Sequence, residues 1–588
     1  IESFEDEPWP RWRFRLTDDL VIEQEIFVPH GESAVMLSWR VVAGGADPGG
    51  NGPGHTLDQP ASTPPATTLR VRPLFSGRDF HSTHHENGAF NFNAEVNGQR
   101  VTCRSYEGVP AVIAFSNGRF AHEPTWYRNF LHTEEQARGL DAIEDLASPG
   151  VFEFSLSKKE PAVLMLGAVA GSGDPGSSNQ PASTPPATES IEARYAQVRS
   201  NELRRRGSFK SPLERAADAY LVRRGEGKTL IAGYPWFGDW GRDTFIALRG
   251  LCIATGRLED ARDILVEWAG TVSQGMLPNR FPDSGEQPEF NSVDASLWYI
   301  IAVGDYLLAA EKRPGLTDDC HTEQLRGAIE AILLGYSTGT RFGIRADDDG
   351  LLAAGERGQQ LTWMDARVDG REITPRIGKP VEIQALWLNA LAIGARFSAR
   401  WQMLLEKGRA AFENRFWNED AGQLADVIDC DHRTGDLDLT FRPNQIFAVG
   451  GLPLQVLSGD RARRLVEAVE ARLLTPLGLR SLAPGESGYT PHYGGSVAQR
   501  DGSYHQGTVW PWLIGAFVEA WVRVRGNTDA AKKEARDRFL PPLYRHLKEA
   551  GLGHISEICD AEPPQAPRGC PFQAWSLGEL LRLERNVL

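Results

Sequence analysis

The sequence predicts a multidomain α and β protein, with an N-terminal antiparallel β-sandwich over residues 1–195 followed by an (α/α)6 barrel over residues 196–588. Three observations support this prediction. A length of 588 residues favours more than one domain. Apolar residues alternate in short runs up to about residue 166, between clusters of Gly, Pro, Asn and Asp. After residue 190 the spacing of apolar residues lengthens to that of an α-helix, and it stays so to residue 588.

The N-terminal part contains short extended runs rich in Val, Ile and Phe, as an antiparallel sandwich requires. We expect strands over residues 20–28, 34–42, 69–74, 101–106, 111–116, 151–156 and 162–166. Two inserts, at residues 43–67 and 171–188, both contain Gln-Pro-Ala-Ser-Thr-Pro-Pro-Ala-Thr. Because such a Pro/Ser/Thr segment cannot bury a face, we interpret both inserts as surface excursions.

The C-terminal part is predicted to be helical, and Ser211 followed by Pro212 is typical of a helix start. The twelve expected helices cover residues 212–222, 237–255, 258–274, 292–311, 322–336, 381–395, 398–416, 443–454, 461–473, 508–522, 530–549 and 572–588. Residues 508–518 are apolar nearly all round, which indicates an inner layer, whereas 530–549 is amphipathic and indicates an outer layer. Twelve helices alternating between these layers form an (α/α)6 barrel, with the connecting loops gathered at one end.

Composition narrows the class of protein. Hydrophobic residues make up 41% and charged residues 24% of the chain, and no apolar run reaches the length of a membrane span. A net charge of −15 disfavours a nucleic-acid partner and suits a neutral ligand. The six cysteines lack CxxC spacing, so we expect a reducing cytoplasm and no zinc ribbon. Residues 78–81 with His84 and His85 match no standard zinc pattern and are interpreted as a polar loop, so we expect no metal.

The segment over residues 233–244 combines three glycines and a proline with Trp236, Trp240, Asp239, Arg242 and Asp243. Glycine and proline indicate a loop, yet a linker rarely carries so many aromatic residues. Flat indole faces beside forked donors and acceptors suit a sugar ring with its hydroxyl groups. The segment is therefore interpreted as one wall of a carbohydrate pocket; the alternative is a packing loop whose charges pair with each other.

Two carboxylates are candidates for acid and base catalysis. Asp365 follows Trp363 and Met364, and a partly desolvated carboxyl has a raised pKa that keeps the proton a general acid donates. Glu557, flanked by Ile555 and Ile558, is predicted to be half-buried. The alternatives are a surface aspartate that caps a turn and a glutamate in a salt bridge.

Five motifs together resemble the amylo-α-1,6-glucosidase module of glycogen debranching enzymes. They are Gly-Tyr-Pro-Trp-Phe-Gly-Asp-Trp-Gly-Arg-Asp-Thr at 233–244, Thr-Trp-Met-Asp at 362–365, Pro-Val-Glu-Ile-Gln at 380–384, Tyr-His-Gln-Gly at 504–507 and Gln-Ala-Trp-Ser at 573–576. The β-domain is similar to the N-terminal domain of the short prokaryotic members. The resemblance implies a barrel related to glucoamylase, inverting hydrolysis of an α-1,6-linked glucosyl stub of a branched α-glucan, and no cofactor.

Carried over to this chain, the resemblance makes Asp365 the general acid and Glu557 the base. It also gives Arg242 and Asp243 the grip on the terminal glucose. The other residues expected to line the pocket are Trp236, Asp239, Trp240, Trp363, Glu382, His505 and Gln506. Ile-Ser-Glu-Ile-Cys-Asp around Glu557 departs from the Leu-Pro-Glu-Leu-Thr-Asn of eukaryotic relatives, which makes the base the looser of the two catalytic matches.

Other functions are compatible with the same pattern. An inverting glycoside phosphorylase also joins a β-sandwich to an (α/α)6 barrel but replaces the base with a phosphate site. A glucoamylase-like exo-glucosidase and a non-catalytic glycan-binding protein are further alternatives. The sequence leaves the oligomeric state and any glucanotransferase activity open.

Overall fold

The computed structural model describes residues 1–18, 20–42, 67–78, 82–137, 141–156, 160–169, 189–281, 287–313, 315–316 and 319–588. Apart from Thr67, the two inserts expected at 43–67 and 171–188 lie outside the described residues. Backbone contacts divide the chain into two units, Ile1–Gln136 with Leu140–Phe209, and Ala137–Gly139 with Lys210–Leu588. The boundary predicted after residue 195 falls inside helix α2 (Ile191–Gly207), whereas the division between the two units comes after that helix.

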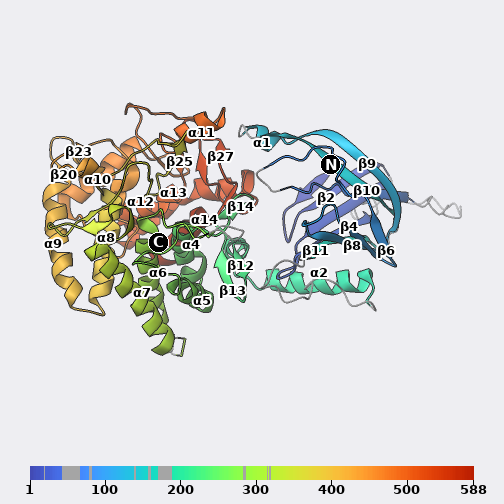
Figure 1. Cartoon of the computed structure of the whole chain (residues 1–588), viewed down its shortest axis with the longest axis horizontal. Helices are drawn as coiled ribbons and strands as arrows, with labels where there is room; N and C mark the ends of the chain where they lie inside the picture. Colours follow the sequence, from blue (N-terminus) through green and yellow to red (C-terminus); the bar gives the residue numbers. More distant parts are fainter. Residues whose placement is uncertain are drawn as a thin grey trace, which may run out of the picture. The chain divides into compact units, whose positions relative to one another are not determined.

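The N-terminal unit contains two antiparallel sheets (Figure 1). The larger sheet has the order β1 (Ser3–Glu5), β2 (Arg11–Thr17), β3 (Leu20–Phe27), β4 (Ala34–Val42), β11 (Ala162–Val169), β8 (Ala111–Ser116), β7 (Arg100–Cys103), β6 (Ala94–Asn97). The smaller sheet has the order β5 (Thr67–Val71), β10 (Ile143–Leu156), β9 (Arg119–Leu131). All seven runs predicted to be extended contain strands of these sheets.

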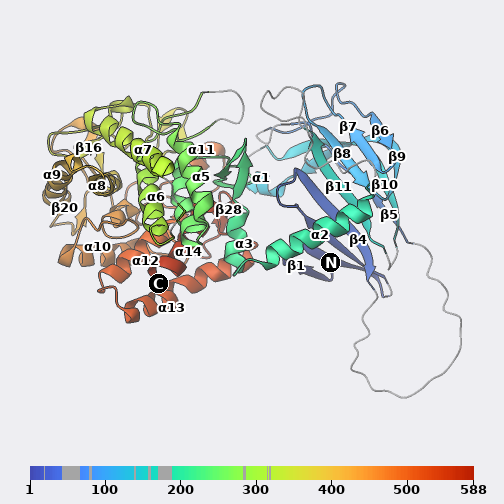
Figure 2. The same ribbon diagram turned by 90° about the horizontal axis from the view of Figure 1, so that it is seen from below.

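Different elements cover the two faces of the larger sheet. Leu164 of β11 shares a buried core with Phe152 of β10, so one face packs against the smaller sheet. The flanking residues Val163 and Met165 point to the other face and share a core with Ile191 of α2, which runs along this sheet (Figure 2). The alternation along one strand therefore supplies two separate cores.

Strand β9 was not predicted from the sequence. Its residues are mostly polar and partly exposed, and Pro124 lies within it. Proline cannot donate a ladder hydrogen bond and is confined to edge strands, and β9 is an edge strand of the smaller sheet.

The C-terminal unit is mainly helical. Its helices are α3 (Pro212–Asp218), α4 (Gly241–Leu248), α5 (Leu258–Ala269), α6 (Asp294–Ala310), α7 (Asp319–Thr338), α8 (Val381–Ala395), α9 (Arg400–Arg415), α10 (Gly459–Arg472), α11 (Val497–Ser503), α12 (Leu513–Arg523), α13 (Asp529–Glu549) and α14 (Ala574–Arg582). A π-helical turn, η1 (Arg249–Ala254), continues α4, and a second, η5 (Leu583–Val587), continues α14; η4 (Pro443–Ala448) is a 3₁₀ helix.

Six of these elements contact one another in a closed series. Helix α4 contacts α6, α6 contacts α8, α8 contacts η4, η4 contacts α12, α12 contacts α14, and α14 contacts α4. These elements are buried on nearly all sides, as apolar residues all round a helix predict. Helices α3, α5, α7, α9, α10 and α13 each contact a member of the series or its continuation η1; α8, for example, lies between α6 and α9 in both views (Figures 1 and 2).

Several helices differ from their predicted bounds. The helix predicted over 443–454 is a short 3₁₀ helix, because Gly450 and Gly451 follow it where the backbone approaches α12 too closely for a Cβ atom. The helix predicted from residue 508 begins at Leu513, after strand β25 (Val509–Trp510) and Pro511. The helix predicted from residue 572 begins at Ala574, because β28 (Phe572–Gln573) pairs with β14 (Gly233–Tyr234).

The polar motifs lie at the amino-terminal ends of the buried helices. Arg242 and Asp243 are in the first turn of α4, Asp294 begins α6, Glu382 is in the first turn of α8, and Gln573 precedes α14. Hydrogen bonds between these ends place them at one side of the helical unit. Across the described part of the chain, no helix is long and apolar enough to span a membrane.

The contact between η1 and α14 gives a test of this packing. A Cβ atom at Gly250 would lie 1.8 Å from the carbonyl oxygen of Gly578. We expect Gly250→Ala to lower the free energy of unfolding by about 1–3 kcal/mol, because two packed backbones must separate. The matched control is Gly327→Ala in α7, where a Cβ meets open space. Denaturant unfolding should show the control unchanged or more stable by about 0.5–1 kcal/mol, and equal effects of the two variants would contradict the prediction.

Candidate active site

Arg242 connects two carboxylates from separate elements. Its Nε donates to Asp294 Oδ1 and Oδ2 at 2.9 and 2.8 Å, and its Nη1 donates to Asp365 Oδ2 at 3.0 Å. The Arg242 side chain is only 4% exposed; burial lowers its pKa, but the surrounding carboxylates outweigh burial and raise the pKa above its ordinary value. The guanidinium group therefore stays charged and fixes the segment that carries Asp365 relative to α4 and α6. The sequence prediction did not assign Asp294 to the site.

Asp365 is partly exposed although protein atoms crowd its carboxyl. Its side chain remains 36% exposed, whereas Thr362, Trp363 and Met364 before it are buried. Protein atoms nevertheless surround the carboxyl closely enough for desolvation to raise its pKa, an effect that Arg242 opposes. The carboxyl is therefore partly desolvated and still reachable from solvent.

The charges of both predicted catalytic residues affect the pKa of Asp243. It is buried, and Gln573 Nε2 donates to its Oδ2 at 3.1 Å. The pKa of Asp243 is raised to about 8: burial raises it most, Arg242 lowers it, and the charges of Glu557 and Asp365 also raise it. Because Glu557 and Asp365 act on the same carboxyl, both belong to the surroundings of Asp243.

Glu557 is held on both carboxylate oxygens. The Tyr504 hydroxyl donates to Oε1, and the backbone N–H of Cys570 donates to Oε2 at 2.9 Å. Burial and the Glu557 charge raise the pKa of Tyr504 well above its ordinary value, so the phenol keeps the proton it donates. Gly569 permits this approach, since a Cβ atom there would lie 2.3 Å from Glu557 Oε2. The pairing of β26 (Ile558–Cys559) with β27 (Pro567–Arg568) brings the two segments together.

Tyr504, Gly569 and Cys570 were missed as site residues. Tyr504 belongs to the quoted Tyr-His-Gln-Gly motif, which was the available signal, but nothing in a sequence says that it reaches residue 557. Gly569 and Cys570 follow a proline-rich turn and carry no side-chain chemistry that points to Glu557. Their role comes from the backbone.

The loop before α4 presents half-buried residues. Trp236, Asp239 and Trp240 are all partly exposed. Asp239 Oδ2 accepts from Arg224 Nη1 at 2.6 Å, and the Arg280 guanidinium lies 5.4 Å from the centre of the Trp240 ring. The loop therefore combines the pairing of charges that a packing loop would show with aromatic surface that remains accessible.

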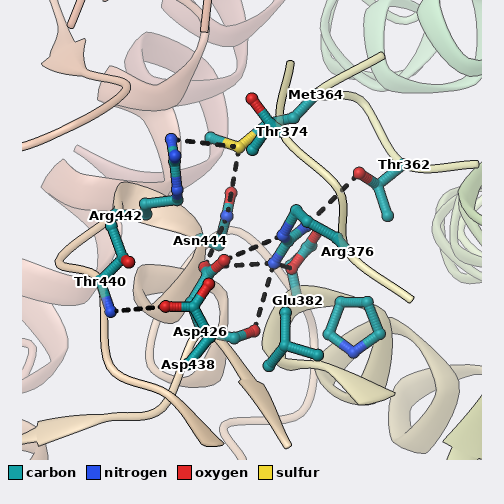
Figure 3. A network of polar contacts seen from close by, with 12 residues as sticks. Thr362, Met364, Thr374, Arg376, Glu382, Asp426, Asp438, Thr440, Arg442 and Asn444 are labelled. Atoms are coloured by element: carbon teal, nitrogen blue, oxygen red, sulfur yellow. Dashed lines mark hydrogen bonds and ion pairs between the residues drawn. The ribbon is translucent and has the colours of Figure 1, made fainter. Parts of the chain in front are cut away.

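Four residues predicted to line the pocket, Trp363, Glu382, His505 and Gln506, are buried, and the contacts described for them are with other protein groups. Trp363 Nε1 donates to Asn444 Oδ1 at 2.8 Å, and Glu382 is paired with Arg376 (Figure 3). His505 is fully buried and stacks on Trp510, with ring centres 5.1 Å apart, and burial lowers its pKa well below the ordinary value.

Gln506, the fourth of these residues, accepts from Arg442 Nη2 at 3.1 Å and donates to Thr374 Oγ1 at 2.7 Å. Both ends of its amide group are therefore occupied by protein. The side chain is also buried. Its described hydrogen bonds are therefore bonds within the protein.

The histidine-rich segment of the N-terminal unit forms protein contacts. His84 is buried, with Nδ1 2.9 Å from the Asp145 carbonyl oxygen and Nε2 2.6 Å from the Tyr106 hydroxyl. Arg78 pairs with Glu144 at 2.6 Å. Residues 79–81 lie outside the described residues, and among those that are described no group of three His, Cys, Asp or Glu is arranged to hold a metal ion.

Comparison with protein families gives two matches in chain order. Residues 215–582, more than half of the chain, match the family described as amylo-alpha-1,6-glucosidase, and residues 1–163 match the glycogen debranching enzyme N-terminal family. The glycogen debranching enzyme of Saccharomyces cerevisiae is 26% identical over 464 residues, which cover 60% of this chain and 30% of the yeast protein. The chain thus spans less than a third of that relative's length.

Solved structures are similar in fold. A bacterial glucoamylase complexed with acarbose has a TM-score of 0.59 at 12% identity, covering 96% of this chain and 81% of the glucoamylase. A mannosylglycerate hydrolase from Thermus thermophilus in complex with glucose has a TM-score of 0.45 at 18% identity, covering 64% of this chain and 100% of the hydrolase.

The raised pKa of Asp243 makes the stability of the site depend on pH. A carboxyl whose pKa is higher in the folded than in the unfolded chain destabilises the folded state as pH rises between the two values, here from about 4 to about 8. We expect Asp243→Asn to be more stable than the wild type, with a gap that widens by up to about 1.4 kcal/mol per pH unit in this window. Denaturant unfolding at about pH 5 and about pH 8 measures the gap. Asp420→Asn at an exposed position is the control, and a gap independent of pH would refute the prediction.

Proposed function

The chain belongs to the amylo-alpha-1,6-glucosidase family, and from that premise we propose that it hydrolyses α-1,6-glucosidic branch linkages of glycogen-like α-glucans. One arrangement carries the proposal: Asp365 and Glu557, far apart in the sequence, both connect to the first turn of α4 within the segment that matches the family. Arg242 bonds to Asp365, and Asp243 accepts from Gln573, three residues after the Cys570 N–H that donates to Glu557. Glycoside hydrolysis needs two such carboxyl groups, one to protonate the leaving oxygen and one to direct water.

Asp365 is assigned as the general acid. Desolvation raises its pKa, so the carboxyl retains a proton more readily than a surface aspartate, and its exposure leaves it accessible to a substrate. In the proposed reaction it donates this proton to the glycosidic oxygen as the bond to the anomeric carbon breaks. Arg242 then stabilises the carboxylate that remains.

Glu557 is assigned as the general base. The hydrogen bonds from Tyr504 and Cys570 fix both of its oxygens, so the carboxylate cannot turn away from its position. It takes a proton from the water that attacks the anomeric carbon from the opposite face. Inversion by this route requires the two carboxyl groups to lie about 6.5–9.5 Å apart, and we expect that separation between Asp365 and Glu557.

The remaining residues are assigned by their position relative to Asp365 and Glu557. We place the terminal glucosyl unit against Arg242 and Asp243, with Trp236, Asp239 and Trp240 on the wall of the pocket. Buried Trp363, Glu382, His505 and Gln506 support this wall from behind. No metal or cofactor is required by a mechanism of two carboxyl groups.

We also infer the finer architecture. The core shared between the two N-terminal sheets supports a β-sandwich, and the closed series of six buried helices supports an (α/α)6 barrel. The fold similarity to a bacterial glucoamylase over 96% of this chain agrees with both. The two units are proposed to be separate domains, with the catalytic one following α2. Scattered cysteines remain the reason for placing the protein in the cytoplasm.

The first experiment measures free glucose released from a branched limit dextrin with single α-1,6-linked glucosyl stubs. We expect Asp365→Asn and Glu557→Gln each to lower turnover by about 10²–10⁴-fold, because each removes one proton transfer. Asp420→Asn and Glu413→Gln, at exposed positions, are the matched controls and should keep wild-type turnover. Adding phosphate separates a phosphorylase, which would release glucose 1-phosphate and tolerate Glu557→Gln. Binding of dextrin without any product would leave only the glycan-binding alternative.

The stereochemistry of the product tests the mechanism independently. Water directed by Glu557 attacks opposite the leaving oxygen, so an α-linkage should give β-glucose as the first product. Proton NMR during the first turnovers distinguishes the two anomers before they equilibrate. Early α-glucose would mean retention, and with it a separation of the carboxyl groups near about 5 Å.

A further inference from the structure

Behind the proposed site lies a buried network of charges centred on Arg376 (Figure 3). Arg376 Nη2 donates to Glu382 Oε2 at 2.7 Å, and Nε and Nη2 donate to Asp426 Oδ2 and Oδ1 at 2.9 and 3.1 Å. All three side chains are almost completely buried. Removing a partner from such a pair leaves an uncompensated charge, so the network resists rearrangement.

Asn444, in the first turn of η4, extends this network by one amide group. Its Nδ2 donates to Asp426 Oδ1 at 2.8 Å (Figure 3). Its Oδ1 accepts from Trp363 Nε1, also at 2.8 Å. An indole N–H can only donate, and the carboxylate paired with Arg376 accepts. The amide must therefore face both groups in one orientation. An aspartate, a leucine or an alanine at position 444 could not satisfy the two partners together.

The same network contacts Thr362, Trp363 and Met364, the three residues that precede Asp365. Arg376 Nη1 donates to Thr362 Oγ1 at 3.4 Å, Asn444 Oδ1 accepts from Trp363, and Asn444 Nδ2 lies 3.6 Å from Met364 Sδ. Three consecutive side chains are thus held from one side. The next side chain, Asp365, is partly exposed.

We propose that Asn444 is a positioning residue that acts through Trp363 and Met364 to hold the Asp365 carboxyl in place. This inference rests on the proposed role of Asp365 as general acid. Proton transfer requires the carboxyl within hydrogen-bond distance of the glycosidic oxygen, and a shift of about 1 Å costs on the order of 10²-fold in rate. The hydrogen bonds described for Asn444 do not include one to Asp365. Asn444 determines the position of the acid only through the residues that precede it.

The test compares two substrates that differ in their need for an acid. Glucose release from the limit dextrin requires protonation of the leaving oxygen, whereas fluoride leaves α-D-glucosyl fluoride without a proton. Asn444→Leu keeps the number and branching of the side chain's heavy atoms and removes both hydrogen bonds. We expect its kcat on limit dextrin to fall about 10- to 100-fold, its KM to change little, and its turnover of the fluoride to fall less than about threefold.

Trp363→Phe tests the same link from the other side. It removes the indole N–H that Asn444 accepts and keeps an aromatic ring in the cluster with His505, Trp510 and Trp512. We expect the same contrast between the two substrates, and a double variant with Asn444→Leu should lose less than the product of the two single losses. If Asn444→Leu does not fold, the single Trp363→Phe variant decides in its place.

Asn389→Leu is the matched control. Asn389 is likewise a buried asparagine of the helical unit, but its amide bonds to Leu454 and Ala385 and has no hydrogen bond to residues 362–365, all of which the structure describes. Its loss should affect both substrates equally, whatever it does to stability. Equal losses on the two substrates for folded Asn444→Leu, or no loss on either, would overturn the positioning role. A wild-type protein that releases no glucose from limit dextrin would instead overturn the proposed function.

Discussion

The bonds that Arg242 makes to Asp294 and Asp365 set the geometry on which the site depends. They join the first turn of α4, the first residue of α6 and a loop that has no regular structure of its own. A buried ion pair contributes little net stability once desolvation is counted, but it fixes the relative positions of its partners. Without Arg242, the position of Asp365 would be set only by the side chains that precede it.

The helical unit supports this arrangement through the direction of its buried helices. Asp243, Asp294 and Glu382 all lie in first turns, where the unpaired backbone N–H groups and the helix dipole favour negative charge. Charged side chains at the same end of neighbouring helices can therefore be desolvated together at a lower cost than in a helix interior. The loops that carry Asp365 and Glu557 pack against this closed series of helices, which restricts their movement.

Much of this could be predicted from the sequence, because periodicity and turn residues are local. The extended runs near residues 20–42 and most of the predicted helices have their counterparts in the structure. Strand β9 was missed, and the helix at η4 was predicted too long. Pro124 is compatible with a strand only because β9 lies at a sheet edge, and Gly450 and Gly451 are required only because the backbone approaches α12 closely; both are tertiary contacts. Motifs located the site loops but could not say which side chain faces outward. Glu382 and His505 were assigned to the pocket wall for that reason, and both are buried behind it.

The balance of charge separates the two layers of the site. The buried part of the network in Figure 3 sets Arg376 and Arg442 against Glu382 and Asp426, whereas Asp438, at its edge, is only half-buried. Around Arg242, by contrast, lie three described carboxylates, those of Asp243, Asp294 and Asp365, and Glu557 adds its charge to the surroundings of Asp243. An excess of desolvated carboxylates binds protons more tightly than a balanced set, and the raised pKa values of Asp243 and Asp365 follow from it. A second arginine in this layer would make the carboxylates easier to ionise and would remove the proton that a general acid must donate. The neutral layer can therefore be rigid directly behind an acidic layer that must keep a proton available.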